Sequence, residues 1–152
     1  MGALRNRFWE RGLEELTRDE WEALCDGCGR CCLHKLEDED TGAIEHTNVA
    51  CRLLDCATAK CSNYRHRRAF VPDCMRLSLA NVYEARWLPD HCAYRRRAEG
   101  RPIPDWHPLL TGDPDAAVNA GVSAAGRCIS ETRAGPLEHH IVNWRTHRKY
   151  SA

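Results

Sequence analysis

Four cysteines fall within eight residues near the start of the chain: Cys25, Cys28, Cys31 and Cys32. Thiolates this close together repel one another and oxidise readily, so the cluster indicates a soft, multiply charged metal ion. Two residues between successive cysteines allow a tight turn in which both sulfurs face one ion. Gly27 and Gly29 supply the backbone freedom that such a turn needs.

Further cysteines complete a candidate set of eight metal ligands: Cys51, Cys61, Cys74 and Cys92. We interpret the remaining two, Cys56 and Cys128, as structural, because an isolated cysteine is commonly a small buried hydrophobe. Consecutive side chains diverge in extended backbone, so the neighbours Cys31 and Cys32 favour two metal centres or one bridged centre.

Two kinds of site fit these thiols. In the first, zinc or iron binds as single ions, and zinc takes four ligands in a tetrahedral shell. In the second, Cys25, Cys28 and Cys31 match the first three ligands of a ferredoxin-type run, and a distant cysteine completes an iron–sulfur cluster. The first predicts a metal-binding protein, and the second a redox protein or a component of an oxidoreductase.

Other side chains near the cysteines are open candidates for the same site. Asp38 and Asp40 offer carboxylate oxygens and His34 offers a ring nitrogen. Eight thiolates around two divalent ions leave a surplus of negative charge, which nearby arginines can offset by hydrogen bonding. We expect this role for Arg30, Arg52 and Arg65.

The pattern between the cysteines predicts an α+β fold. Thr17 and Glu20 form a capping box for a helix running towards Cys25. Residues 33–37 and 44–49 read as two strands of a hairpin, with the polar turn 38–42 between them. Further expectations are helices over 90–100 and 114–120 and a strand around 128–130. We expect one small irregular domain, residues 1–152, with short helices, a small β-hairpin and stabilisation by metal.

Composition limits the partners of the chain. Its 22 basic and 22 acidic residues cancel, so no overall field favours nucleic acid. The longest uncharged stretch, 116–126, is too short to cross a bilayer, and the start of the chain lacks the apolar run of a signal peptide. We expect a cytoplasmic protein with no membrane contact, where reduction favours metal-bound thiols over the alternative of a secreted disulfide scaffold. Metal ions are the expected partners, and a protein partner stays open.

No catalytic residue is predicted. The sequence shows no evident nucleophile–base–orienter triad and no glycine-rich phosphate loop. Whether the chain is an enzyme is therefore left open.

The sequence resembles the YcgN-like family of bacterial cysteine-cluster proteins, which belong with the YkgJ-type CxxCxxCC proteins. The resemblance includes LCDGCGRCCLHKLEDEDTG at 24–42, ACRLLD at 50–55, VPDC at 71–74, CAYR at 92–95 and PDWHPL at 104–109. It extends over most of the chain. It implies a zinc- or iron-chelating domain and names no reaction, while related sequences in a flagellin lysine methylase keep the redox alternative open.

Overall fold

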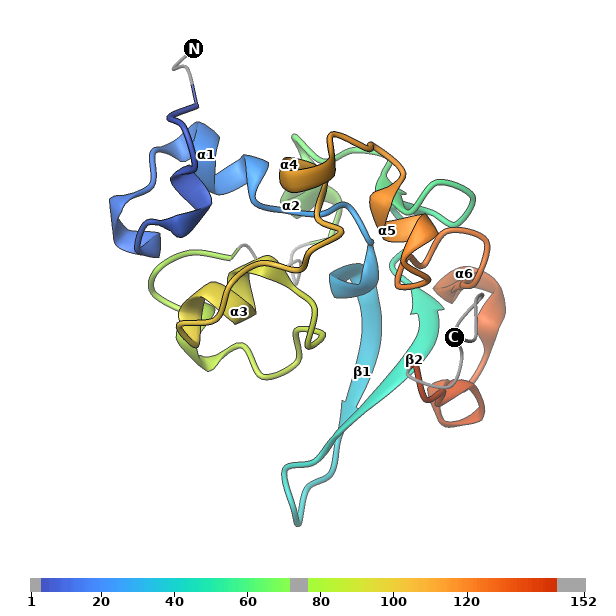
Figure 1. Ribbon diagram of the computed structural model, residues 1–152. Helices are drawn as coiled ribbons and strands as arrows, with labels where there is room; N and C mark the ends of the chain where they lie inside the picture. The colour runs from blue at the N-terminus through green and yellow to red at the C-terminus, as the bar shows by residue number, and fades with distance from the viewer. Residues whose placement is uncertain (1–3, 72–76, 145–152) are drawn as a thin grey trace. The chain divides into compact units, whose positions relative to one another are not determined.

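The computed structural model describes residues 4–71 and 77–144. The chain divides into two compact units, of which the first comprises residues 1–26 and 76–117 and the second residues 27–75 and 118–152. Short helices and small sheets confirm the predicted α+β class (Figure 1). That residues 1–152 form one domain stays a prediction, and the predicted ligand Cys74 lies outside the described residues.

The first unit is built from short helical segments. They are η1 (Phe8–Glu10), η2 (Leu13–Glu15), α1 (Arg18–Ala23), η4 (Val82–Glu84), α3 (Ala93–Ala98) and α4 (Pro108–Thr111), and α5 (Ala116–Asn119) runs across the boundary of the two units. None exceeds six residues, so packing rather than helix propensity must hold them. The buried side chains that pack together are Phe8, Leu13, Leu24, Val82, Ala85, Leu88, Ala93, Tyr94 and Ile103.

Helix α1 begins with the predicted capping box. The Thr17 hydroxyl accepts a hydrogen bond from the Glu20 amide at 3.2 Å, and Glu20 Oε1 accepts one from the Thr17 amide at 2.9 Å. The Glu20 carboxylate is fully buried and also accepts hydrogen bonds from the guanidinium and the amide of Arg5. The guanidinium holds the pKa of Glu20 far below its usual range, despite burial.

Helix α3 starts later than the sequence predicts. Its N-cap is Cys92, because a turn closed by the Cys92 amide on the Pro89 carbonyl at 3.0 Å precedes it. The Asp90 carboxylate accepts a hydrogen bond from Arg101 instead of capping the helix. The expected helix over 114–120 is likewise reduced to the four residues of α5.

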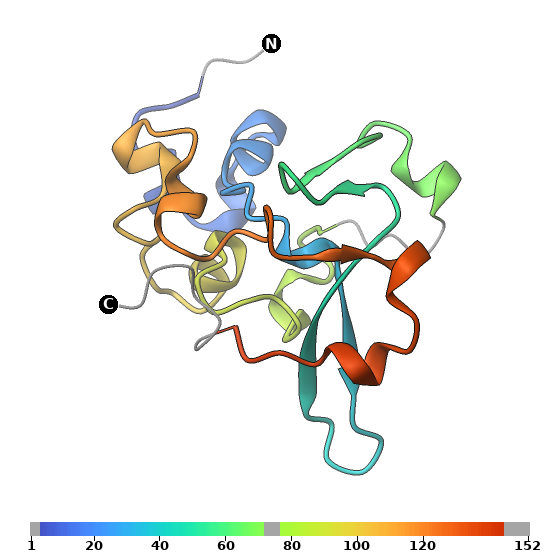
Figure 2. The ribbon, with the colours of Figure 1, turned by 90° about the vertical axis from the view of Figure 1, so that its right-hand side faces the viewer.

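The second unit is built around a hairpin. Strands β1 (Leu33–Glu37) and β2 (Ile44–Ala50) pair antiparallel, and β5 (Ile129–Ser130) pairs with β2 in parallel to give the order β1-β2-β5. In Figure 2 the red C-terminal segment runs beside β2, which agrees with a bridge between Thr47 and Ile141. The predicted hairpin and the strand around 128–130 are both confirmed.

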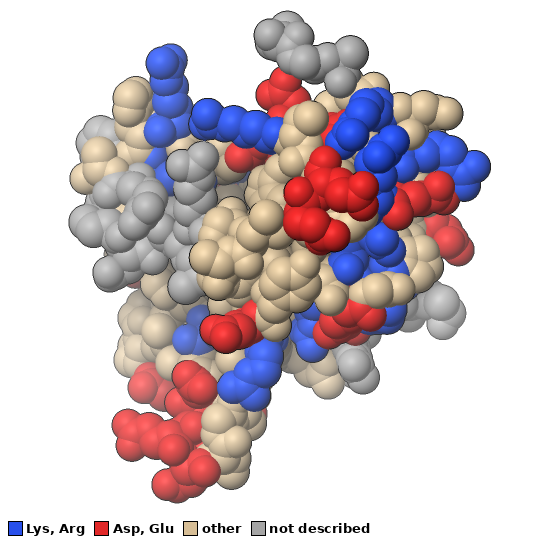
Figure 3. Space-filling model, turned by 90° about the vertical axis from the view of Figure 1, so that its left-hand side faces the viewer, with Lys and Arg blue, Asp and Glu red and all other residues tan. Residues whose placement is uncertain are grey.

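The turn of the hairpin is acidic. Asp38 Oδ1 accepts hydrogen bonds from the amides of Asp40 and Thr41 at 2.8 and 2.9 Å, which closes the turn. Residues 37–40 are all acidic and exposed, and Figure 3 shows acidic side chains gathered around the hairpin turn. The carboxylate of Asp38 thus has a structural role.

A smaller sheet and four short helices complete the described part of the second unit. They are η3 (Arg30–Cys32), β3 (Leu54–Asp55), β4 (Lys60–Cys61), α2 (Arg67–Phe70), α6 (Glu131–Ala134) and η5 (Leu137–His140). Its buried cluster consists of Leu33, Ala50, Leu54, Ala59, Ala124 and Trp144. Within the described residues, no helix is long and apolar enough to cross a bilayer.

Acid should destabilise the first unit through Glu20. Because folding lowers the pKa of Glu20, its ionised carboxylate stabilises the folded state at pH values above its pKa in the unfolded chain, about 4.3. This stabilisation is lost progressively as the pH falls below that value. We expect Glu20→Gln to lower the melting temperature by several degrees at pH 7 and by less at pH 3. Thermal melts at both pH values check this, with Glu10→Gln in the exposed Arg7 pair as a control that should change little.

Gly29 should be irreplaceable for two reasons. Its φ is +76°, and a Cβ atom there would lie 2.8 Å from the Cβ and the carbonyl oxygen of Ala59. Gly27 has the same φ, but no atom lies within 4 Å of a Cβ placed there. The variant Gly27→Ala therefore measures the cost of the positive φ alone, about 1–2 kcal/mol. We expect Gly29→Ala to lower the free energy of unfolding more than Gly27→Ala in urea melts. Equal losses would show that contact with Ala59 is unimportant.

Candidate metal centre

The second unit brings cysteines from three separate segments together. Cys28, Cys31 and Cys32 come from the turn before β1, Cys51 follows β2, and Cys61 ends β4. Cys31, Cys51 and Cys61 each raise the pKa of the Cys32 thiol, so each of the three lies near Cys32. Their burial is graded, because Cys28 is buried, Cys32, Cys51 and Cys61 are half-buried and Cys31 is exposed.

The turn that carries the first three thiols follows from its glycines. Gly27 and Gly29 both adopt φ +76°, a conformation that costs other residues energy. After Gly29 the chain forms η3, closed by the Cys32 amide on the Gly29 carbonyl at 3.1 Å, and passes into β1. The Cys28 carbonyl accepts a hydrogen bond from the Ala124 amide at 2.8 Å. The turn is therefore held from within and by the later part of the unit.

Backbone pairing positions Cys51 and Cys61. The Cys51 amide donates to the Cys32 carbonyl at 2.9 Å, and the Cys51 carbonyl accepts from the Leu54 amide at 2.8 Å. Leu54 in β3 pairs with Cys61 in β4. These contacts link the segments of Cys32, Cys51 and Cys61 through a continuous chain of backbone hydrogen bonds.

Cys31 and Cys32 do not diverge as the sequence suggests. The expectation assumed extended backbone, whereas the two residues lie in the 3-10 helix η3 and their side chains hydrogen-bond each other. This hydrogen bond, burial and the neighbouring thiolates raise the pKa of Cys32 far above its usual range. The argument for two metal centres therefore does not follow from this pair alone.

Lys35 is a cation beside the thiols that sequence reasoning missed. Its Nζ donates to the carbonyls of Arg30 and Leu33, both at 2.7 Å. Burial lowers the pKa of Lys35 to about 8, while the thiolates of Cys31, Cys32 and Cys28 oppose that shift. The signal in the sequence was a lysine four residues after Cys31, between Leu33 and Leu36 of the predicted strand.

Two of the three arginines that we expected to hydrogen-bond near the thiols contact residues other than cysteines. The Arg30 guanidinium lies 4.7 Å from the ring centroid of Trp144, and Arg127 lies 4.6 Å from the same ring. Arg52 approaches Glu131 at 3.8 Å, and Arg65 is exposed. Arg30 also helps to lower the pKa of Lys35, so its charge acts beside the thiols.

The other open candidates are engaged elsewhere. His34 Nε2 lies 2.5 Å from Glu131 Oε2, which links β1 to α6, and Asp38 closes the hairpin turn. Asp40 is exposed in that turn. Cys56 and Cys128, which we interpreted as separate structural thiols, hydrogen-bond each other.

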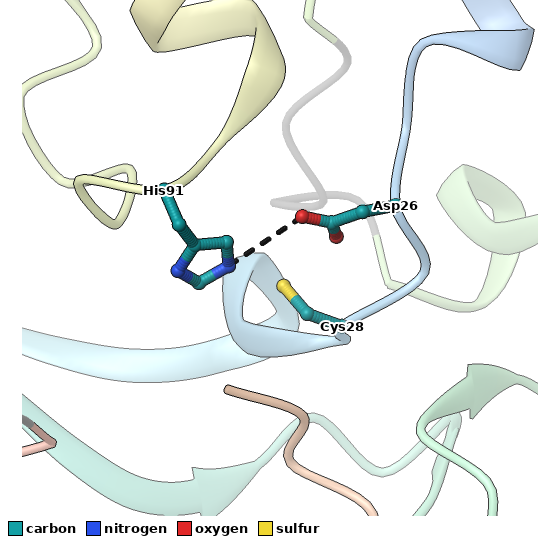
Figure 4. Close-up of side chains that lie close together, drawn as sticks. All are labelled: Asp26, Cys28 and His91. Carbon is teal, nitrogen blue, oxygen red and sulfur yellow. Dashed lines mark ion pairs between the residues drawn. The ribbon is translucent and has the colours of Figure 1, made fainter. Parts of the chain in front are cut away.

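The first unit holds Cys25 and Cys92 on adjoining segments. Each is the direct neighbour of one member of an ion pair, in which His91 Nε2 lies 3.6 Å from Asp26 Oδ2 (Figure 4). Both members of this pair are largely buried. Cys28, also drawn in Figure 4, follows two residues after Asp26 and belongs to the second unit.

His107 fixes the chain just before Cys25. It is fully buried, its Nδ1 accepts from the Leu109 amide at 3.0 Å, and its Nε2 therefore donates to the Leu24 carbonyl at 2.8 Å. Burial lowers the pKa of His107, which favours this neutral form. Sequence reasoning missed both His91 and His107, although His91 stands directly before a predicted ligand.

The clustered thiols define a cysteine-cluster domain of the CxxCxxCC type. A family model of that name, described as "Putative zinc- or iron-chelating domain", matches residues 24–93. A UPF0260 protein of Rhizorhabdus wittichii is 60% identical over 90% of this chain and 94% of its own length. UPF0260 proteins of Gluconacetobacter diazotrophicus and Shewanella oneidensis are 55% and 51% identical over 90% of this chain, covering 86% and 94% of their own lengths.

The chain belongs to the UPF0260 family. No solved structure matches it. Membership of a family whose domain is described as zinc- or iron-chelating agrees with the chemistry of the donor set, because thiolates suit both ions.

Lys35 should support metal binding without being a ligand. Its ammonium group offsets thiolate charge and fixes the backbone of η3, so Lys35→Met removes a charge and leaves two carbonyls without this donor. We expect metal affinity to fall by about tenfold or more. Competition with a coloured chelator at pH 7 measures this. Lys60→Met, on the exposed β4 lysine, is the matched control and should bind metal as the wild type does.

Proposed function

We propose that the second unit binds a zinc or iron ion through thiolates drawn from Cys28, Cys31, Cys32, Cys51 and Cys61. The observation that carries this proposal is that thiols from three segments lie close enough to Cys32 for each of them to raise its pKa. Neutral thiols are stabilised little by packing together, whereas thiolates around a cation are strongly stabilised by its positive charge.

Proton release accompanies the proposed binding. A thiol ligates as its thiolate, and the high pKa of Cys32 means that its proton must be displaced by the metal. A bound divalent cation supplies the positive charge that the cluster lacks, and Lys35 adds to it. Metal affinity should therefore fall as the pH falls.

The proposed metal also has a structural effect. Strands β3 and β4 have two residues each, and so short a hairpin is marginal without further support. Ligation of Cys61 in β4 and Cys51 before β3 would tie this hairpin to the turn at Cys28. Binding free energy would then be folding free energy for the second unit.

Cys25, Cys74 and Cys92 complete the predicted ligand set and stay part of the proposal. Support for Cys25 and Cys92 is their placement beside the Asp26–His91 pair. Serine variants of each, analysed for metal content, decide whether they belong to the site.

Elemental analysis of protein purified without oxygen tests the proposal. We expect stoichiometric zinc or iron without acid-labile sulfide. Brown protein with sulfide would select the iron–sulfur alternative, which gains no support from the comparisons. Absence of any bound metal after expression in metal-supplemented medium would overturn both.

Single serine variants sharpen this test. We expect Cys61→Ser and Cys32→Ser to lose most of the bound metal and to melt at a lower temperature, because each removes a proposed ligand. Cys128→Ser, a matched change of a half-buried cysteine outside the ligand set, should keep its metal. Metal content in the purified proteins, measured together with thermal melting, distinguishes these results. Equal metal content in all three variants would contradict the ligand assignment.

A further inference from the structure

Cys56 and Cys128, which are not among the proposed ligands, form a second thiol pair in the second unit. Cys56 directly follows β3, and Cys128 directly precedes β5. Their side chains hydrogen-bond each other, although 71 residues separate them in the sequence. Both are half-buried and pack against the buried cluster of the unit.

The backbone around the pair is well fixed. The Cys56 carbonyl accepts a hydrogen bond from the Gly126 amide at 2.6 Å, and the amides of Thr58 and Ala59 close the β3–β4 turn on the Asp55 carbonyl. Asp55 Oδ1 accepts a further bond from the Ala57 amide at 2.8 Å. The two sulfurs are therefore brought together by a folded framework rather than by flexible loops.

The pair is chemically asymmetric. Burial and the hydrogen bond to Cys56 raise the pKa of Cys128 to about 12, and the charge of Asp55 acts in the same direction. A thiol that holds its proton more strongly is the poorer nucleophile, so we assign Cys56 as the attacking sulfur and Cys128 as the resolving one.

We propose that Cys56 and Cys128 form a reversible redox dithiol, which small peroxides oxidise to an intramolecular disulfide while the metal ligands keep their ion. The backbone hydrogen bond between Gly126 and Cys56, the packing of both thiols against one buried cluster and their partial exposure carry this inference. It does not depend on the proposed metal function, because neither cysteine belongs to the ligand set.

The reaction with hydrogen peroxide balances in two steps. The Cys56 thiolate attacks one peroxide oxygen, the O–O bond breaks and hydroxide leaves, so that Cys56 becomes a sulfenic acid. The Cys128 sulfur then attacks the Cys56 sulfur, the S–O bond breaks, and the leaving hydroxide takes the Cys128 proton to form water. In total, two thiols and one peroxide give one disulfide and two waters.

Oxidation would cross-link the β3–β4 turn to the segment before β5. Closing a long loop in this way restricts the unfolded chain and stabilises the fold. The melting temperature of the oxidised wild type should therefore rise by several degrees, and a dithiol reductant should reverse the rise.

Peptide mapping of the full-length protein, purified with its metal, tests the proposal. The wild type is treated with hydrogen peroxide, alkylated without reduction and digested, in parallel with Cys56→Ser, Cys128→Ser and the double variant. We expect a peptide pair joined through Cys56 and Cys128 in the wild type alone. Cys128→Ser should accumulate a Cys56 sulfenic acid that a dimedone probe labels, and Cys56→Ser should give no such label at Cys128.

Two results would overturn the proposal. One is recovery of Cys56 and Cys128 as separate thiols, or joined to other cysteines, after treatment that oxidises a control thiol. The other is loss of metal from the double variant, which would make the pair ligands instead. If wild type and variants alike contain no metal, the proposed metal function fails, whereas mapping of the Cys56–Cys128 link still decides the redox inference. Mapping on the wild type also decides it if a variant does not fold.

Discussion

Mutual repulsion of closely packed thiolates is the constraint on which the second unit depends. Charges on Cys31, Cys51 and Cys61, which come from three segments, all act on Cys32. Protonation of Cys32 and the ammonium group of Lys35 reduce the resulting repulsion. Neither response neutralises several thiolates at once. A divalent cation does, which is why a domain with this donor set is best understood as a receptor for metal.

Local conformation makes that convergence possible. Gly29 takes a positive φ and passes so close to Ala59 that a side chain would collide there. The chain then turns through η3 into β1, and the Cys51 amide binds the Cys32 carbonyl across the hairpin. Backbone hydrogen bonds therefore largely determine the positions of the cysteine sulfur atoms.

Local chemistry was readable in the sequence, and long-range pairing was not. Thr17 and Glu20 satisfy each other within one turn, so their capping box was predictable, as was the hairpin around the turn at Asp38. The tight turn that carries Cys28 was also predictable, because Gly27 and Gly29 supply the backbone freedom it needs. Contacts such as His91 with Asp26, or Cys56 with Cys128, join residues far apart in sequence, and no periodic pattern encodes them. Tertiary packing also shortened helix α3, which a local cap rule placed too early.

Strand β1 lies at one edge of its sheet, next to the acidic hairpin turn. An edge strand can recruit a strand from another molecule, and the risk is greatest when overall charge gives no repulsion, as in this chain with equal acids and bases. Here β1 has an irregular register between Leu33 and Lys35, and four consecutive acids cover its end. The concentrated negative charge of the turn would keep neighbouring molecules apart at this edge, even near the isoelectric point, where the overall charge gives no repulsion.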